Sequence, residues 1–153
     1  MKEYISRSED ETEKIAYDLA GTLKSSDIIV LDGDLGAGKT KFMYGIAKYF
    51  NVENLVSSPT FTIVNEYPLS KQKNGISNIY HFDVYRLLGS DDFIDSIGTD
   101  YFDNGLCIIE WGNIIKDILP NIYIYVKIEH IPAEDNFRKI TIYEKYEKGD
   151  NIL

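Results

Sequence analysis

Residues 33–40 combine glycines with a lysine and a threonine at a spacing that suits the binding of phosphate groups. Glycines allow a backbone to wrap closely around phosphates and to adopt positive φ angles. Successive backbone N–H groups then point at the anion, helped by the N-terminus of the helix that follows. We therefore predict a P-loop that binds a triphosphate, most simply that of ATP, through all eight residues of Gly33-Asp34-Leu35-Gly36-Ala37-Gly38-Lys39-Thr40.

The same pattern predicts the chemistry of its last two residues. Lys39 would reach the β- and γ-phosphates, and the Thr40 hydroxyl would ligate Mg²⁺. A P-loop also needs an acidic group for the metal, usually at the end of a neighbouring buried strand. Glu110 and Asp83 both follow strand-like runs. We favour Glu110 for the metal, because its strand is the more apolar, and the two carboxylates could divide the work between metal and attacking water.

Other polar residues have weaker signals. Thr60 closes Ser57-Ser58-Pro59-Thr60, where a hydroxyl could sense the γ-phosphate or the metal, although Ser-Pro is also common in turns. Arg86 could touch phosphate or make a surface ion pair. His81 and His130 are predicted to be structural, and the single cysteine, Cys107, is predicted to be a small buried hydrophobic side chain.

The elements that position these residues can be read from the spacing of apolar side chains. Ser8 and Glu11 form a capping-box pattern before a helical face that includes Ile15 and Leu19. Residues 28–31 form a short continuous apolar run, typical of a strand buried on both faces. Residues 39–50 have helical spacing, so the glycine loop lies between a buried strand and a helix.

The second half of the chain is richer in strands. We predict extended segments at 60–67 and 79–85 with a polar turn near 71–75, a short helix at 91–97 and a buried strand at 106–111. Segments 122–128 and 138–143 suit the edge of a sheet. The order of elements predicts one α/β, P-loop NTPase-like three-layer domain over residues 1–153, with a mixed, partly parallel β-sheet.

Composition narrows the classes of function. The chain has 153 residues, a formal net charge of −9 and only three arginines. A broad surface that binds nucleic acid is therefore disfavoured. No apolar run approaches the roughly 20 residues of a membrane helix, and the first residues lack the apolar core of a signal peptide. We expect a cytoplasmic protein without a membrane partner.

Several motifs in succession resemble those of the TsaE (YjeE-like) family, from about residue 8 to residue 120. The resemblance begins with the glycine loop. It continues through Ser58-Pro59-Thr60-Phe61, His81-Phe82-Asp83-Val84-Tyr85-Arg86-Leu87, Tyr101-Phe102, Ile109-Glu110-Trp111 and Leu119-Pro120.

The resemblance implies a small Mg²⁺-dependent ATPase that is slow alone and supports threonylcarbamoylation of adenosine 37 in tRNA. Its implied partners are the TsaD-like catalytic subunit of the tRNA-modifying pair and the TsaB-like non-catalytic homologue, with tRNA reached only indirectly. By matching positions, Lys39 would bind phosphate while Thr40 and Glu110 hold magnesium. Asp83 and Thr60 would lie nearest the γ-phosphate, and Trp111 would pack near the nucleotide or in the core.

The chain departs from the family pattern at three positions: Lys41 replaces a second threonine, and Gly112 and Asn113 replace a proline and an acidic residue. Two other functions remain open, a small-molecule kinase and a regulatory module that barely hydrolyses its nucleotide. A kinase would need more cations around its acceptor than three arginines readily supply. A GTPase would carry an Asn-Lys-x-Asp motif, which this sequence lacks.

Overall fold

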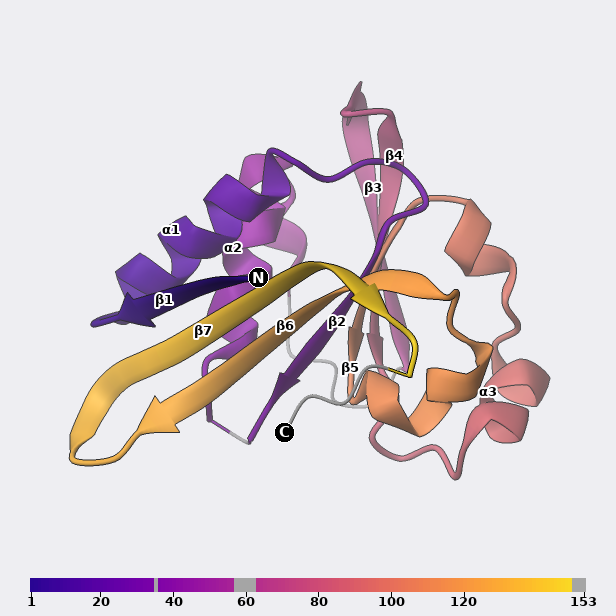
Figure 1. Cartoon of the computed structure of the whole chain (residues 1–153). Coiled ribbons are helices and arrows are strands. Elements are labelled where there is room, and N and C mark those ends of the chain that lie inside the picture. The colour runs from indigo at the N-terminus through magenta and orange to yellow at the C-terminus, as the bar shows by residue number, and fades with distance from the viewer. Residues whose placement is uncertain (35, 57–62, 150–153) are drawn as a thin grey trace.

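The computed structural model describes residues 1–34, 36–56 and 63–149, and it contains a single seven-stranded sheet in the order β1-β7-β6-β2-β5-β4-β3 (Figure 1). The central pairs β6/β2, β2/β5 and β5/β4 are parallel, and the outer pairs are antiparallel. The strands are β1 (Lys2–Ser6), β2 (Ile28–Gly33), β3 (Val64–Lys73), β4 (Ile76–Asp83), β5 (Leu106–Glu110), β6 (Ile122–Ile131) and β7 (Glu134–Glu147). This confirms the predicted mixed α/β sheet.

Helices cover both faces of the sheet, which makes three layers. On one face lie α1 (Glu9–Ala20) and α2 (Lys39–Tyr49), which pack against each other. On the other lie α3 (Ser90–Ser96) and the 3₁₀ segment Gly112–Ile118; two further 3₁₀ turns are Glu53–Leu55 and Asp100–Asp103. α1 begins as its sequence predicts, because the Ser8 hydroxyl accepts a hydrogen bond from the Glu11 N–H.

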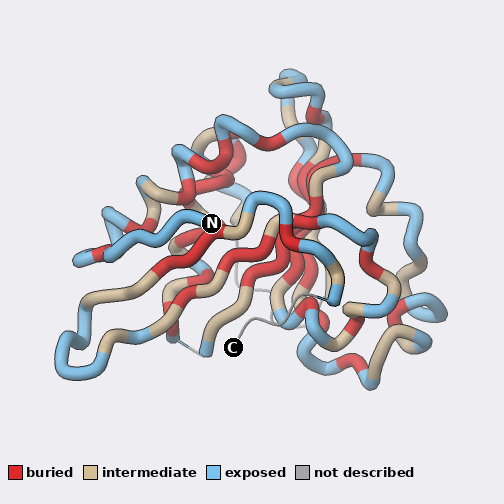
Figure 2. Tube along the Cα trace, in the orientation of Figure 1, coloured by how far each residue is buried: buried red, intermediate tan, exposed pale blue. Residues whose placement is uncertain are grey.

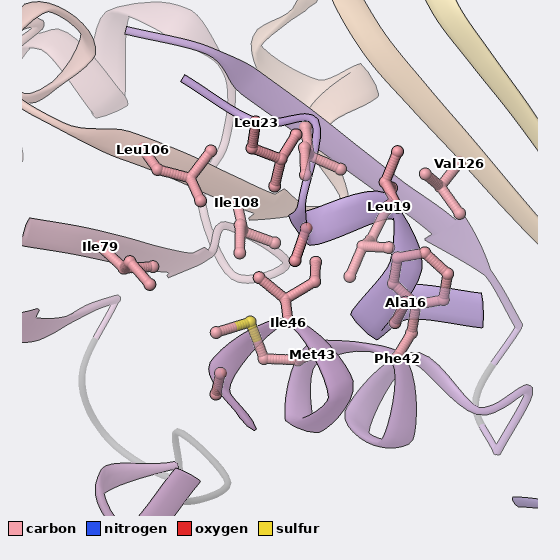
Figure 3. Close-up of a cluster of buried hydrophobic side chains, with 14 of the residues drawn as sticks. Ala16, Leu19, Leu23, Phe42, Met43, Ile46, Ile79, Leu106, Ile108 and Val126 are labelled. Carbon is pink, nitrogen blue, oxygen red and sulfur yellow. The ribbon is translucent and has the colours of Figure 1, made fainter. Parts of the chain in front are cut away.

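Successive side chains of the central strands point to opposite faces of the sheet, so the hydrophobic core is divided into two clusters, one on each face. Ile29 and Ile108 pack with α1 and α2, whereas Val30 and Ile109 pack on the opposite face. Figure 3 shows the first of these clusters, where Met43 and Ile46 of α2 point at the strands. The central strands are buried along most of their length, whereas the tips of the β3–β4 and β6–β7 hairpins are exposed (Figure 2).

The ends of three parallel strands meet at one edge of the sheet. In the strand register, Glu110 lies opposite Leu31 of β2 on one side and Asp83 of β4 on the other. The glycine loop leaves β2 at this same edge, because parallel strands point their carboxyl ends in one direction. The two predicted carboxylates and the loop are therefore neighbours.

The last third of the chain differs from its prediction. β6 is not an edge strand but the neighbour of β2, and β7 lies inside the sheet because β1 pairs with its outer side. β1 was not predicted: four of its five residues are exposed, so it has no alternating apolar pattern to find. The β3–β4 turn is also tighter than predicted, at Asn74 and Gly75, which both have positive φ.

Candidate nucleotide-binding site

The backbone of the glycine loop needs its glycines for two separate reasons. Gly36 and Gly38 have φ angles of 78° and 111°, in the region that side chains disfavour. Gly33 is needed for space, because a Cβ there would lie 2.7 Å from the backbone oxygen of Ile128 on β6. Of the eight predicted loop residues, Leu35 lies outside the described residues.

The loop leads directly into α2, and the N-terminus of this helix is suited to binding an anion. Gly38 is the N-cap of α2, and no described side chain caps the helix there. The first backbone N–H groups of a helix have no partner within the helix, so an anion can satisfy them. Thr40 is exposed in the first turn, so its hydroxyl is accessible to a ligand.

Lys39 is buried and held between an acid and an aromatic ring. Only 8% of the residue is exposed. Its Nζ lies 3.9 Å from Glu110 Oε1 and 4.5 Å from the centroid of the Trp111 ring. Trp111 is 36% exposed, has a φ of 64°, and stacks obliquely against Tyr85, with the ring centroids 4.9 Å apart. Of the two positions left open for Trp111, the structure places it beside the loop lysine rather than in the core.

Glu110 receives a second contact from a residue that was predicted to be only structural. His81 Nε2 lies 2.8 Å from Glu110 Oε2, and His81 is 3% exposed. The two side chains meet because both continue the face of Ile79 and Ile108, which points toward α2. The signal in the sequence was the spacing of His81 two residues before Asp83, which places both on one side of a strand.

Asp83 lies beside Glu110 in the register of β4 and β5. Its Oδ1 accepts a hydrogen bond of 3.1 Å from the N–H of Tyr85, which fixes the turn that leaves the strand. The hydroxyl-bearing segment 57–60, including Thr60, lies outside the described residues. The structure thus brings Lys39, Asp83, Glu110 and Trp111 together around one loop.

Arg138, from β7, binds the outside of the loop and was missed in the sequence. Its Nε donates to the backbone oxygen of Ala37 at 2.9 Å, and its Nη2 donates to that of Gly36 at 3.4 Å. Nη1 of the same guanidinium donates to the backbone oxygen of Asp135, near the start of β7. A residue about 100 positions away thus ties the loop to a hairpin, whereas Arg86 is exposed and forms no ion pair with another described residue.

A tyrosine supports the strand that enters the loop. The Tyr125 hydroxyl of β6 donates to the carboxylate of Asp32, the residue before Gly33. The Asn113 side chain lies near the same hydroxyl and acts to lower its pKa. Burial, and then the Asp32 carboxylate, raise the pKa of Tyr125 above its ordinary value, so the hydroxyl remains a donor.

A hollow of about 390 Å³ opens beside the loop, in the range of small-molecule sites. It carries two of the three arginines, Arg7 and Arg138, together with Lys41. The remaining lining residues come from the start of α1, the loop and the start of β7: Ser8, Glu9, Asp10, Thr12, Gly36, Ala37, Gly38 and Asn136. Three cationic side chains therefore face two carboxylates, Glu9 and Asp10, in this hollow.

The donor set suits Mg²⁺ bound together with phosphate rather than a metal held by protein alone. No group of three or more His, Cys, Asp or Glu side chains among the described residues could hold a metal ion. Mg²⁺ typically binds through one or two carboxylates, several waters and the phosphates of its substrate. Thr40 and Glu110 provide a hydroxyl and a carboxylate of this kind.

Comparisons with known proteins converge on one family. The family model for "Threonylcarbamoyl adenosine biosynthesis protein TsaE" matches residues 6–140. The chain is 40% identical over 134 residues to the tRNA threonylcarbamoyladenosine biosynthesis protein TsaE of Bacillus subtilis, covering 86% of this chain and 78% of that protein. It is 39% identical over 147 residues to the Aquifex aeolicus protein of the same name, covering 95% and 98%.

A solved structure agrees with these relatives. The crystal structure of Bacillus subtilis YdiB superposes with a TM-score of 0.70 at 33% sequence identity, and the match covers 92% of this chain and 83% of that one. Separately, no helix in the described part of the chain has the length and apolar character needed to cross a lipid bilayer.

Proposed function

Because the chain belongs to the TsaE family of threonylcarbamoyl adenosine biosynthesis proteins, we propose that it is the ATPase that supports this tRNA modification. One observation carries the proposal: Lys39, at the start of an uncapped helix, is buried against Glu110 under a loop with two left-handed glycines. A lysine and a carboxylate in this relation suit a phosphate chain and its metal.

The bound triphosphate would occupy the turn of the loop, with its charge facing the first N–H groups of α2. Lys39 would then exchange its contact with Glu110 for the β- and γ-phosphates. Because Glu110 lies beside the buried ammonium group, the lysine is held close to the position where it is needed. The hollow beside the loop, between Arg7 and Arg138, would receive the nucleoside.

Mg²⁺ would be held by the Thr40 hydroxyl and the Glu110 carboxylate, and when bound it would offset negative charge on the phosphates. Asp83, next to Glu110, is the group best placed to orient the attacking water. Thr60 is proposed for the same neighbourhood on the family resemblance alone. Trp111 would shield Lys39 and the phosphates from water, because its ring already covers the ammonium group.

The partners proposed are the TsaD-like catalytic subunit and the TsaB-like non-catalytic homologue of the tRNA-modifying pair. ATP turnover would act on that pair, and tRNA would be met only through it, because a chain with a net charge of −9 repels nucleic acid at a distance. Both ATP and tRNA are available in the cytoplasm, which is the proposed compartment.

A steady-state ATPase assay, with and without the tRNA-modifying pair and scored also for modified tRNA, tests the proposal. We expect slow hydrolysis by the chain alone, a clear increase with the pair, and no activity for Lys39→Ala, which should also bind ATP more weakly in calorimetry. Lack of stimulation together with phosphate transfer to a small acceptor would favour a kinase. Nucleotide binding with negligible turnover in all conditions would favour a regulatory module.

A further inference from the structure

His81 occupies a position between two polar side chains that the proposed function does not explain. The ring is buried in β4, with Nε2 2.8 Å from Glu110 Oε2 and Nδ1 3.4 Å from the Tyr67 hydroxyl of β3. Buried polar atoms normally have hydrogen-bond partners, so the contacts by themselves are compatible with a structural histidine. His81 differs from an ordinary structural histidine because its partner is Glu110, the carboxylate beside the glycine loop.

We propose that His81, oriented by Tyr67, is a positioning residue that holds the Glu110 carboxylate ready for Mg²⁺; the inference rests on the proposed function of that carboxylate. A carboxylate only accepts hydrogen bonds, so the proton must be on His81 Nε2. In a neutral ring, Nδ1 then accepts, and the Tyr67 hydroxyl is the donor that faces it. The order Tyr67, His81, Glu110 therefore has one consistent direction of donation.

The arrangement matters because the two oxygens of Glu110 have different partners, an ion-pair partner at Oε1 and a hydrogen-bond donor at Oε2. Oε1 faces Lys39 at 3.9 Å, and Oε2 faces His81 at 2.8 Å. When Lys39 turns to a phosphate, its contact with Oε1 weakens, and His81 is the contact that continues to restrain the carboxylate. Metal-binding carboxylates are commonly held in place by hydrogen bonds from residues that do not touch the metal themselves. Removal of such a partner weakens metal affinity.

Three variants separate positioning from packing. His81→Leu removes the donor and keeps a buried side chain, whereas His81→Gln places an amide N–H near the position of Nε2. Tyr67→Phe removes only the hydroxyl that orients the ring. Tyr123→Phe, a buried tyrosine of β6 that packs against Tyr146 on the opposite face of the sheet, is the matched control for loss of a hydroxyl.

Each variant is titrated with Mn²⁺ in the presence of ATP, with bound metal measured by electron paramagnetic resonance, and ATP affinity is measured separately in EDTA. We expect His81→Leu to weaken metal binding about 10- to 100-fold, with His81→Gln recovering most of the loss. Tyr67→Phe should show a smaller effect in the same direction, and Tyr123→Phe none. ATP affinity in EDTA should stay within about twofold of the unchanged protein for all four.

Unaltered metal binding in His81→Leu would overturn the inference, and so would equal losses of ATP binding with and without metal, which indicate a role in packing. If His81→Leu does not fold, His81→Gln and Tyr67→Phe decide: unaltered Tyr67→Phe together with a failure of the glutamine variant to retain metal overturns the proposal. Glu110→Gln tests the premise independently. If Glu110→Gln binds Mn²⁺ as the unchanged protein does, the proposed role of Glu110 fails before that of His81 is considered.

Discussion

Lys39 has two close neighbours that would compete with a phosphate for its ammonium group. Glu110 neutralises it and the Trp111 ring covers it, with Nζ 3.9 Å from the carboxylate and 4.5 Å from the ring centroid. A buried charge without a partner is costly, so Glu110 stabilises the buried ammonium group of Lys39. In the proposed function, the same carboxylate would also hold the metal.

Replacing Glu110 should therefore separate metal binding from phosphate binding. Glu110→Ala is expected to lower Mg²⁺-dependent ATP hydrolysis by about 100-fold or more. ATP binding in EDTA should be retained or strengthened, because Lys39 no longer has a competing anion. Calorimetry with EDTA and with Mg²⁺ measures both. If Asp83→Ala produces this pattern and Glu110→Ala does not, the roles of the two carboxylates are reversed.

Burial changes the pKa of the Cys107 thiol and therefore its reactivity. Burial, followed by the nearby Asp103 carboxylate, raises the pKa of this thiol from 9.0 to about 12. The thiol is protonated in both the folded and the unfolded state below pH 9. As the pH rises from 9 toward 12, the thiol ionises first in the unfolded state, so the folded state loses stability over this range. The thiol should not react with a disulfide reagent at pH 8 until denaturant unfolds the chain. Rapid stoichiometric reaction of the native protein would contradict the buried position.

At the scale of elements, α2 is held in place by a contact that only a glycine permits. Gly45 of α2 lies against α1, where an added Cβ would be 2.2 Å from the backbone oxygen of Glu13 and 2.8 Å from the Cβ of Ala16. Since α2 carries Lys39 and Thr40 at its N-terminus, this close approach also positions the two residues proposed to bind phosphate and metal. Arg138 restrains the other side of the loop from β7.

Gly45→Ala should increase helix propensity but crowd the contact between α1 and α2, and we expect the crowding to be the larger effect. Alanine favours a helix by about 1 kcal/mol over glycine, but overpacking a filled contact costs about 1–3 kcal/mol, and a backbone oxygen cannot rotate away. We expect a net destabilisation of up to roughly 2 kcal/mol in urea unfolding, from these opposing contributions.

Gly21→Ala is the matched control for this helix substitution. Gly21 has right-handed helical φ and ψ at the C-cap of α1, and an added Cβ would meet its nearest neighbour at 3.5 Å, an ordinary contact. Alanine there should stabilise the protein by about 0.4–1 kcal/mol through the unfolded state. Stabilisation by Gly45→Ala as well would show that the two helices can separate without cost.

At the scale of the whole molecule, charge is distributed unevenly. The chain has a net charge of −9, yet two of its three arginines line the hollow beside the loop. The three cations of this hollow outnumber its two carboxylates, so it can attract a nucleotide, while the overall field opposes the long phosphate backbone of a nucleic acid.

We therefore predict that the isolated chain does not bind tRNA. In a gel-shift experiment at about 50 mM salt, where phosphate contacts are strongest, labelled tRNA should migrate unchanged at micromolar protein. ATP binding should be measurable under the same conditions. A shift of tRNA by the chain alone, lost at higher salt, would mean that a basic surface exists despite the composition.

The sequence by itself determined the features that depend on neighbours along the chain. The glycine loop, the strand before it and the helix after it follow from local spacing, as do the positions of Asp83 and Glu110 at strand ends. These features could be predicted because backbone geometry and side-chain periodicity act over a few residues. The mixed sheet and its α/β character follow from the order of such segments.

Only the tertiary structure decided which distant residues meet. His81 and Glu110 are 29 positions apart, Tyr125 and Asp32 are 93, and Arg138 and Ala37 are 101. The central place of β6 and the pairing of β1 with β7 are likewise set by strand order. Local preference contains no information on such pairings, because they arise when the whole chain buries its apolar faces and satisfies its buried polar groups.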